Sequence, residues 1–195
     1  MHARRNEQII WNEFRQGSER AYSLLFFRYS DLLLSYGYAI TSDREQIKDC
    51  IQELFLDLWR RKEQLSELEK VQHYLLKAFR QILLRRIKQD EKRRLGVFSD
   101  RFDLPVEEHI IHNESDTYRS EFLFGKIENL PQRQKEIIYL KYYQNLSYDE
   151  ICEIMGLQQQ AAWNLVSRAI NKLREMIADR RYILPLFLMG YVFAR

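Results

Sequence analysis

The sequence predicts an all-α protein made of two small helical domains joined by an acidic linker. Six glycines and three prolines are few for 195 residues, and apolar residues recur at helical spacing rather than alternating as they do in strands. Hydrophobic residues make up 46% of the chain and charged residues 30%, which is enough apolar material for packed cores. A chain of this length fits one or two domains.

The first predicted domain, residues 1–95, contains four helices. Ser18 can cap the second helix, and Asp43 belongs to a capping cluster before the third. Leu24 is expected on the apolar stripe of the second helix. The third helix has an apolar stripe that consists of Ile47, Cys50, Ile51, Leu54, Phe55 and Leu58. The four helices are expected over residues 8–15, 18–40, 44–65 and 71–94.

The second predicted domain covers residues 118–181 and also contains four helices. Pro131 suits the first turn of a helix, Ser147 can cap the next one, and Gly156 ends that helix as a left-handed residue. The four helices are expected over residues 118–129, 132–143, 148–155 and 158–180.

An apolar tail is expected after the second domain, over residues 182–195, and it is uncharged except for the final Arg195. A helix needs about 20 apolar residues to cross a bilayer, and the tail is shorter than that. Pro185 and Gly190 interrupt it as well. We therefore expect no stable membrane insertion.

Charge is distributed unevenly along the chain, although the formal net charge is only +3. Residues 72–96 contain eight basic and two acidic residues, whereas residues 99–121 contain seven acidic and two basic ones. The basic stretch lies on the exposed face of the fourth helix, and most of the acidic excess lies in the predicted linker, residues 96–117. This order indicates a surface that binds nucleic acid, followed by a segment that does not compete for the same nucleic acid. The alternative is that both stretches are solvated faces without a partner.

No pattern for catalysis or metal binding is recognisable in the sequence. Cys50 and Cys152 lie far apart among apolar helical positions, which predicts two reduced thiols in a cytoplasmic protein. There is no glycine-rich phosphate loop and no Ser/His/Asp arrangement. We expect no enzyme activity, no catalytic residues, no cofactor and no metal. The four histidines, which form no ligand motif, are His2, His73, His109 and His112.

Residues 147–174 have the spacing of a helix-turn-helix, although an ordinary helical hairpin shares it. A short helix is followed by Gly156, the apolar Leu157 and a second helix with a buried stripe and a polar outer face. Amide and guanidinium groups can bind base edges and phosphates, and an exposed tryptophan can contact a thymine methyl group. The outward side chains of this kind are Gln159, Gln160, Trp163, Asn164 and Arg168.

Several motifs in order make the chain, over roughly residues 8–175, resemble sigma factors of the extracytoplasmic-function group. In the first domain, DCIQELFLDLW matches the group's acidic D-x-x-Q-E-x-F-x-x-x-W helix, and YLLKAFR followed by two arginines matches its promoter-reading helix. In the second domain, LPQRQKEI, SYDEI, Gly156 and RAINKLR match the helix-turn-helix and its flanks. Each match is unspecific alone; their order and spacing carry the resemblance.

The resemblance implies three sets of binding residues and three partners: core RNA polymerase, promoter DNA and an anti-sigma factor. The docking set, which would bind the clamp coiled coil of the polymerase, is Asp49, Gln52 and Glu53. The minus-ten set, which would bind and help open the minus-ten element beside Tyr74 and Phe79, is Lys77, Arg80, Gln81, Arg85 and Arg86. As alternatives, the two aromatic residues could be plain core, and Lys77 and Arg80 could be an ordinary charged surface. The minus-thirty-five set, which would bind the major groove, is Arg133, Ser147, Gln159, Gln160, Trp163, Asn164 and Arg168.

The chain departs from this group at two places. Gln81 stands where family members usually have Asn, and Ala161-Ala162 stands where they usually have Thr-Val. The apolar tail resembles the endings of sigma factors from Bacteroidetes.

Two other functions are compatible with the sequence. One is a helix-turn-helix regulator that binds operator DNA without being a polymerase subunit. The other is a helical adaptor whose apolar tail docks on a protein or membrane surface.

Overall fold

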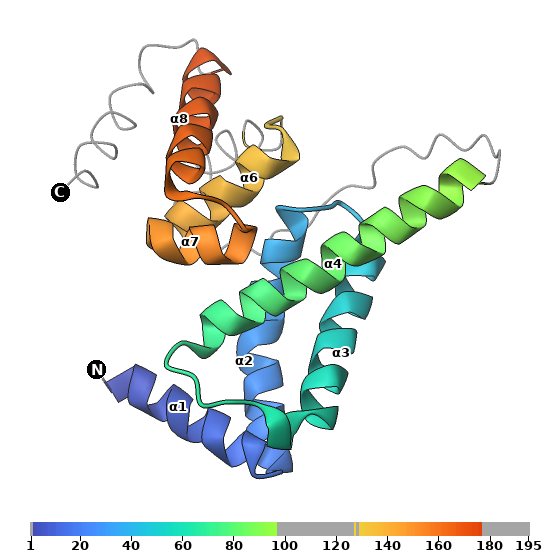
Figure 1. The fold of residues 1–195 in the computed structure, drawn as a ribbon, viewed down its shortest axis with the longest axis vertical. Coiled ribbons are helices and arrows are strands. Elements are labelled where there is room, and N and C mark those ends of the chain that lie inside the picture. Colours follow the sequence, from blue (N-terminus) through green and yellow to red (C-terminus); the bar gives the residue numbers. More distant parts are fainter. Residues whose placement is uncertain (1, 97–126, 128, 177–195) are drawn as a thin grey trace, which may run out of the picture. The chain divides into compact units, whose positions relative to one another are not determined.

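The computed structural model describes residues 2–96, 127 and 129–176, and every element within them is helical (Figure 1). The chain divides into two compact units, which we describe one at a time. The prediction of an all-α fold is confirmed. Three predicted segments lie outside the described residues. They are the linker beyond Gly96, the tail, and the helix at 118–129 apart from Ile127 and Asn129. No helix among those described is long and apolar enough to cross a membrane.

Within residues 2–96, the first unit is built from four α-helices and one 3₁₀ turn. Ser18 caps the second helix, because its Oγ accepts a hydrogen bond of 3.2 Å from the amide of Ala21. Asp43 caps the third in the same way, accepting 3.0 Å from the amide of Gln46. Both caps confirm the sequence prediction. The elements are α1 (His2–Arg15), α2 (Glu19–Tyr38), α3 (Arg44–Arg60), η1 (Lys62–Gln64) and α4 (Val71–Gly96).

The third helix is shorter than predicted, since α3 ends at Arg60 and not at residue 65. Contacts with α1 explain the difference. The side chain of Arg15 donates a hydrogen bond of 2.6 Å to the carbonyl of Leu65, and Trp11 Nε1 donates one of 3.0 Å to the carbonyl of Ser66. Leu65 has an extended backbone, with φ of −74° and ψ of 139°. The two contacts therefore hold the chain in a course that a continued helix would not follow.

The core of the first unit is rich in aromatic side chains. Trp11 and Phe14 of α1 lie together with ring centroids 5.4 Å apart, and Phe26 of α2 packs edge-on against Phe55 of α3 at 5.0 Å. All six residues of the predicted α3 stripe are buried, which confirms that prediction. The prediction for Leu24 is wrong: its side chain is 44% exposed, because α2 meets its neighbours through the adjacent stripe that includes Leu25.

Gly37 lets α2 and α3 approach each other closely. It is a buried residue of α2, and a Cβ atom added to it would overlap the branched side chain of Ile47 on α3. The constraint is the lack of room for a Cβ atom beside Ile47, and not backbone strain.

We expect Gly37→Ala to lower the free energy of unfolding by about 1–3 kcal/mol, because the methyl group pushes α2 away from Ile47. Urea unfolding followed by circular dichroism measures this change. Ser35→Ala, at an exposed position of the same helix, is the control. Equal stability of the two variants would contradict the close approach.

The second unit packs its helices around a small aliphatic core. The elements are α6 (Gln132–Ile138), η2 (Tyr139–Tyr143), α7 (Tyr148–Met155) and α8 (Gln159–Met176). Leu130 and Ile138 pack with Ala169 and Leu173 of α8 to form one buried cluster. Pro131 stands immediately before the first residue of α6, so it serves as the N-cap and not as part of the first turn.

The predicted helix at 132–143 is continuous but changes type halfway. After Ile138 the chain follows a π-helix, and the amide of Gln144 donates to the carbonyl of Tyr139 at 3.1 Å. Asn145 then adopts a left-handed backbone conformation with φ of 50°. The wider turn brings Leu146 to a buried position before α7 begins.

The two thiols have different surroundings. Cys50 is fully buried in the first unit, and burial raises the pKa of its thiol to about 11. Cys152 on α7 is only partly buried, and desolvation raises its pKa as well. Neither environment produces the depressed pKa of a reactive thiol.

Candidate functional site

The docking set lies on the outer face of α3. Asp49 and Gln52 are exposed, and the Glu53 side chain is 39% exposed. Positions three and four residues apart share one face of a helix, so the three side chains project together. The buried stripe on the opposite face fixes the orientation of the helix.

The minus-ten set lies along α4. Gln81 and Arg85 are exposed, while Lys77, Arg80 and Arg86 are half-buried. Five α4 residues, among them Leu75, Phe79 and Leu83, are buried and attach the helix to the rest of the unit. The basic side chains are therefore presented by a fixed helix.

The structure brings the docking set and part of the minus-ten set together. Arg85 forms a hydrogen-bonded ion pair with Glu53, and Arg86 Nη2 lies 4.0 Å from Asp49 Oδ2. One further contact follows along the same seam, where Gln46 Nε2 donates 2.8 Å to Asp90 Oδ2.

The sequence predicts the two sets as separate surfaces and does not predict this pairing. On α3 the partners ascend from Gln46 through Asp49 to Glu53, while on α4 they descend from Asp90 through Arg86 to Arg85. The two helices thus run antiparallel along the seam. The opposite charges of the two faces were the only sequence signal for it.

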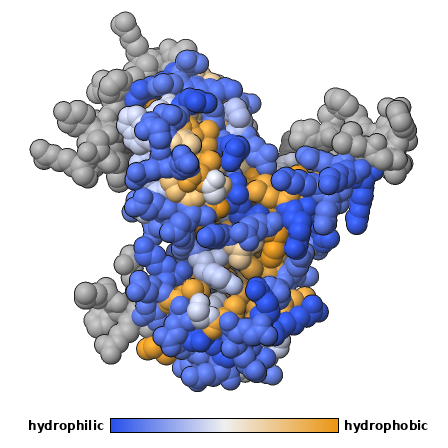
Figure 2. Space-filling model, in the orientation of Figure 1, coloured by the Kyte–Doolittle hydropathy of each residue, from blue (hydrophilic) through white to orange (hydrophobic). Residues whose placement is uncertain are grey.

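A groove between α3 and α4 contains these ion pairs. Its walls include Gln52 and Leu56 from α3 and Gln81 and Ile82 from α4, together with the paired charges. Hydrophilic residues cover most of the visible face, and hydrophobic residues show only in patches between them (Figure 2). A partner that enters the groove meets both signs of charge.

The two aromatic residues expected beside the minus-ten set differ in accessibility. Phe79 is 0% exposed and packs near Tyr36, with ring centroids 6.1 Å apart. The expectation that Phe79 assists opening by stacking on bases is wrong, because its ring belongs to the core. Tyr74 is half-buried and lies edge-on to Trp11 at 5.7 Å.

We expect the pairing of Glu53 with Arg85 to contribute only about 0.2–1 kcal/mol to stability, since both side chains are substantially exposed. A double-mutant cycle of Glu53→Gln and Arg85→Gln measures the coupling free energy by urea unfolding. The coupling should decline as salt is raised. A coupling that salt leaves unchanged would show that the pair is not a surface ion pair.

In the second unit, a capping box begins the helix-turn-helix. Ser147 Oγ accepts a hydrogen bond of 3.3 Å from the amide of Glu150, and the Glu150 carboxylate accepts one of 2.8 Å from the amide of Ser147. Gly156 follows α7 with φ of 64°, the left-handed conformation that the sequence predicted. The turn and its two helices are therefore present as expected.

The outer face of α8 carries most of the minus-thirty-five set. Gln159, Gln160, Trp163 and Arg168 are exposed, Trp163 by 58%, and Asn164 is half-buried. Buried residues of the same helix, Ala162, Val166, Ala169 and Leu173, occupy the opposite face.

Hydrogen bonds orient two of these amides. Gln159 Nε2 donates 3.2 Å to Asp149 of α7, and Gln160 Nε2 donates 3.2 Å to Asn164. The remaining two members, Arg133 on α6 and Ser147 before α7, are exposed as well. Exposed amide and guanidinium groups on the second helix of a helix-turn-helix are groups that can contact base edges in the major groove.

A helix-turn-helix in the second of two helical units is typical of DNA-binding transcription proteins. Residues 25–94 match the family model of sigma-70 region 2, and residues 125–173 match that of sigma-70 region 4. These two segments together make up more than half of the chain. The chain therefore belongs to the sigma-70 family, which confirms the resemblance to sigma factors stated above.

Two solved structures have a similar fold. CnrH, in complex with the cytosolic domain of CnrY, is 16% identical with a TM-score of 0.59, over 88% of this chain and 96% of the other. The sigma factor RpoE from Bartonella quintana, in complex with the anti-sigma factor NepR, is 19% identical with a TM-score of 0.63, over 81% and 98%. No curated protein sequence matches the chain. The Bacteroidetes type stays a prediction.

Proposed function

We propose that the chain is a sigma factor of the extracytoplasmic-function group that binds core RNA polymerase and directs it to promoters. The observation that carries this proposal is the presence, in one chain, of region 2 with a charged α3–α4 surface and region 4 with an exposed recognition face. A protein with this role works in the cytoplasm, where the polymerase and the DNA are. Sigma factors are generally not enzymes, and we propose no catalytic residues here.

The docking set suits a basic protein surface. Asp49 and Glu53 offer two carboxylates, and Gln52 adds an amide between them. A basic partner would compete with Arg85 and Arg86 for these carboxylates. Polymerase docking would then exchange one set of ion pairs for another. The favourable free energy of binding would therefore arise from the fit of the two surfaces and from displaced water as much as from charge.

The minus-ten set suits the backbone and edges of promoter DNA. Arginine and lysine bind phosphates, and Gln81 can pair with an adenine edge. The preceding loop is held to α1 by Trp11 and Arg15, so it can approach DNA in a defined conformation. Tyr74 is the aromatic residue of this region that remains partly accessible for stacking on an unpaired base.

The minus-thirty-five set suits the major groove of duplex DNA. Glutamine and asparagine can pair with adenine, and Arg168 can pair with guanine or with a phosphate. Trp163 supplies an apolar contact. Ser147 is engaged in the capping box, so we propose that it acts on DNA mainly by fixing the start of α7.

An anti-sigma factor is the third proposed partner. The structure of RpoE is that of a complex with an anti-sigma factor, and CnrH was solved with the cytosolic domain of CnrY. We propose that this chain is likewise silenced by a protein that covers its polymerase-binding surface.

An operator-binding regulator is less well supported. Such a protein needs only its helix-turn-helix, whereas region 2 matches over residues 25–94 of this chain. A helical adaptor would leave both matched regions without a role.

We expect Glu53→Lys to reduce recovery of core polymerase by about tenfold in a pull-down with the tagged full chain, because a basic surface is then repelled. Glu63→Lys changes the same charge at an exposed position of η1 and is the matched control. If wild type, Glu63→Lys and Glu53→Lys recover core enzyme equally, the proposed docking surface is wrong.

We expect Trp163→Ala to relax sequence preference in the upstream promoter element, since each lost base contact costs about 1–3 kcal/mol of discrimination. Selection from a randomised upstream element by the polymerase complex measures the preference. Asn171→Ala, about two turns further along α8 and exposed, is the control. Identical selected sequences for wild type and Trp163→Ala would remove Trp163 from the interface.

A further inference from the structure

We propose that the apolar tail, residues 182–195, packs on the second unit beside the end of α8. The surface that receives it, which we call the tail-binding face, consists of Ile127, Tyr142 and Ile170. The proposal goes beyond the proposed function, since it involves neither polymerase nor DNA. It makes the tail a part of the unit that carries the helix-turn-helix, and not an anchor to a membrane or to another protein.

The tail-binding face borders the small aliphatic core of the second unit. Ile138 of α6 and Leu173 of α8 are buried in this core. Ile127 and Ile170 pack against the same cluster but are only partly buried. Tyr142 follows Ile138 by four positions, so both side chains lie on one side of the helix, and Tyr142 is 37% exposed. The three side chains therefore leave apolar surface at the edge of the core.

Tyr142 lies near the last turn of α8. Burial raises the pKa of its phenol, and the positive charge of Arg174 acts against this rise, which indicates that the two side chains are close to each other. Arg174 belongs to the last turn of α8, which ends at Met176. The tail-binding face thus borders the point from which the chain continues toward the tail.

The tail begins close enough to reach this face. Residues 177–181 alone separate Met176 from Tyr182, and an extended segment of that length spans roughly 20 Å. Ile170 precedes Met176 on α8 by roughly 9 Å along the helix axis. A chain that turns back after α8 can therefore lay the tail on the end of the same helix.

The composition of the tail suits an apolar surface. Every residue from Tyr182 to Ala194 is uncharged, and leucine, phenylalanine and other large apolar side chains predominate. Left in water, such a run would be a contiguous apolar patch of the kind that folded monomers rarely expose. The described part of the second unit is small, and a small domain gains stability from each further apolar side chain that it buries.

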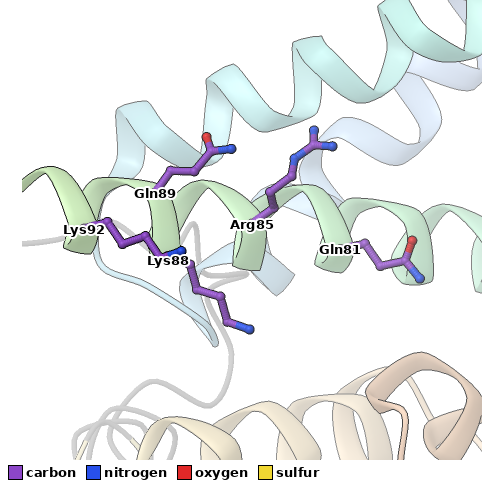
Figure 3. A pocket seen from close by; sticks show the side chains of 5 residues that line it. All are labelled: Gln81, Arg85, Lys88, Gln89 and Lys92. Carbon is purple, nitrogen blue, oxygen red and sulfur yellow. The ribbon is translucent and has the colours of Figure 1, made fainter.

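The hollow along α4 does not suit the tail. Its lining consists of Gln81, Arg85, Lys88, Gln89 and Lys92 (Figure 3). All five side chains are polar or charged, and burying them under leucine and phenylalanine would cost free energy without providing hydrogen bonds. The tail-binding face offers two isoleucine side chains and a tyrosine ring instead.

Packing at the end of α8 leaves the recognition face of that helix accessible. Trp163 is exposed and precedes Ile170 by about two turns. The tail can therefore cover the tail-binding face without covering the amide and guanidinium groups near the start of α8. Its contribution is to hold the last turns of the helix against the core.

Photocrosslinking in the full chain tests the proposal directly. Benzoylphenylalanine replaces Phe187 of the tail, and the crosslinked peptides are identified by mass spectrometry after digestion. We expect crosslinks to the peptides that contain Tyr142 or Ile170. Benzoylphenylalanine in place of the exposed Trp163 is the control in the same unit and should give neither crosslink. A mixture of ¹⁵N-labelled and unlabelled chain distinguishes crosslinks within one chain from those between two copies.

Hydrogen exchange measures what the tail does for α8. In the variant Leu186→Asp/Leu188→Asp, we expect the amides of residues 170–176 to exchange at least about fivefold faster than in wild type, because two charges cannot enter an apolar contact. The variant Gln132→Glu/Gln158→Glu adds the same charge at exposed positions of the second unit and should change these rates less than about twofold. The amides of α3 should exchange equally in all three proteins.

Three results would each overturn the proposal. The first is the absence of crosslinks from position 187 to the peptides with Tyr142 or Ile170. The second is a crosslink that joins two copies, which would make a second copy the occupant of the face. The third is exchange in residues 170–176 that the two tail substitutions leave unchanged. None of these measurements uses polymerase, so a failure of the proposed function is recognised separately, in the pull-down.

Discussion

The antiparallel packing of α3 against α4 is the constraint on which the first unit depends. It places a carboxylate face and a basic face side by side, because Phe55 and Leu58 on one helix and Phe79 and Leu83 on the other are all buried. Gly37 permits α2 to approach α3 closely, which helps to fix the position of α3. Any movement of α3 would therefore change the surroundings of Asp49, Glu53 and their arginine partners together.

This packing explains why the two proposed surfaces are coupled electrostatically. In the free chain, the carboxylates hold Arg85 and Arg86. A basic partner on α3 would release the arginines, and a phosphate on α4 would release the carboxylates. Because such exposed pairs contribute little to stability, exchanging them costs little.

Local signals in the sequence predict where most helices begin and end, but they do not predict which side chains of different helices contact each other. Ser18, Asp43 and Gly156 act as predicted because caps and left-handed turns depend on neighbouring residues. The early end of α3 depends on contacts with α1 that are distant in sequence. Likewise, periodicity could not show that Arg85 meets Glu53, since this pairing follows from how whole helices pack.

Transcription from genomic DNA fragments with purified core enzyme tests most directly whether the chain gives core polymerase its promoter specificity. Adding the chain should produce transcripts from a small set of discrete start sites, each preceded by the same two sequence elements. Core enzyme alone should not use these sites. If the chain binds specific DNA by itself yet adds no start sites, the account is contradicted and an operator-binding regulator takes its place.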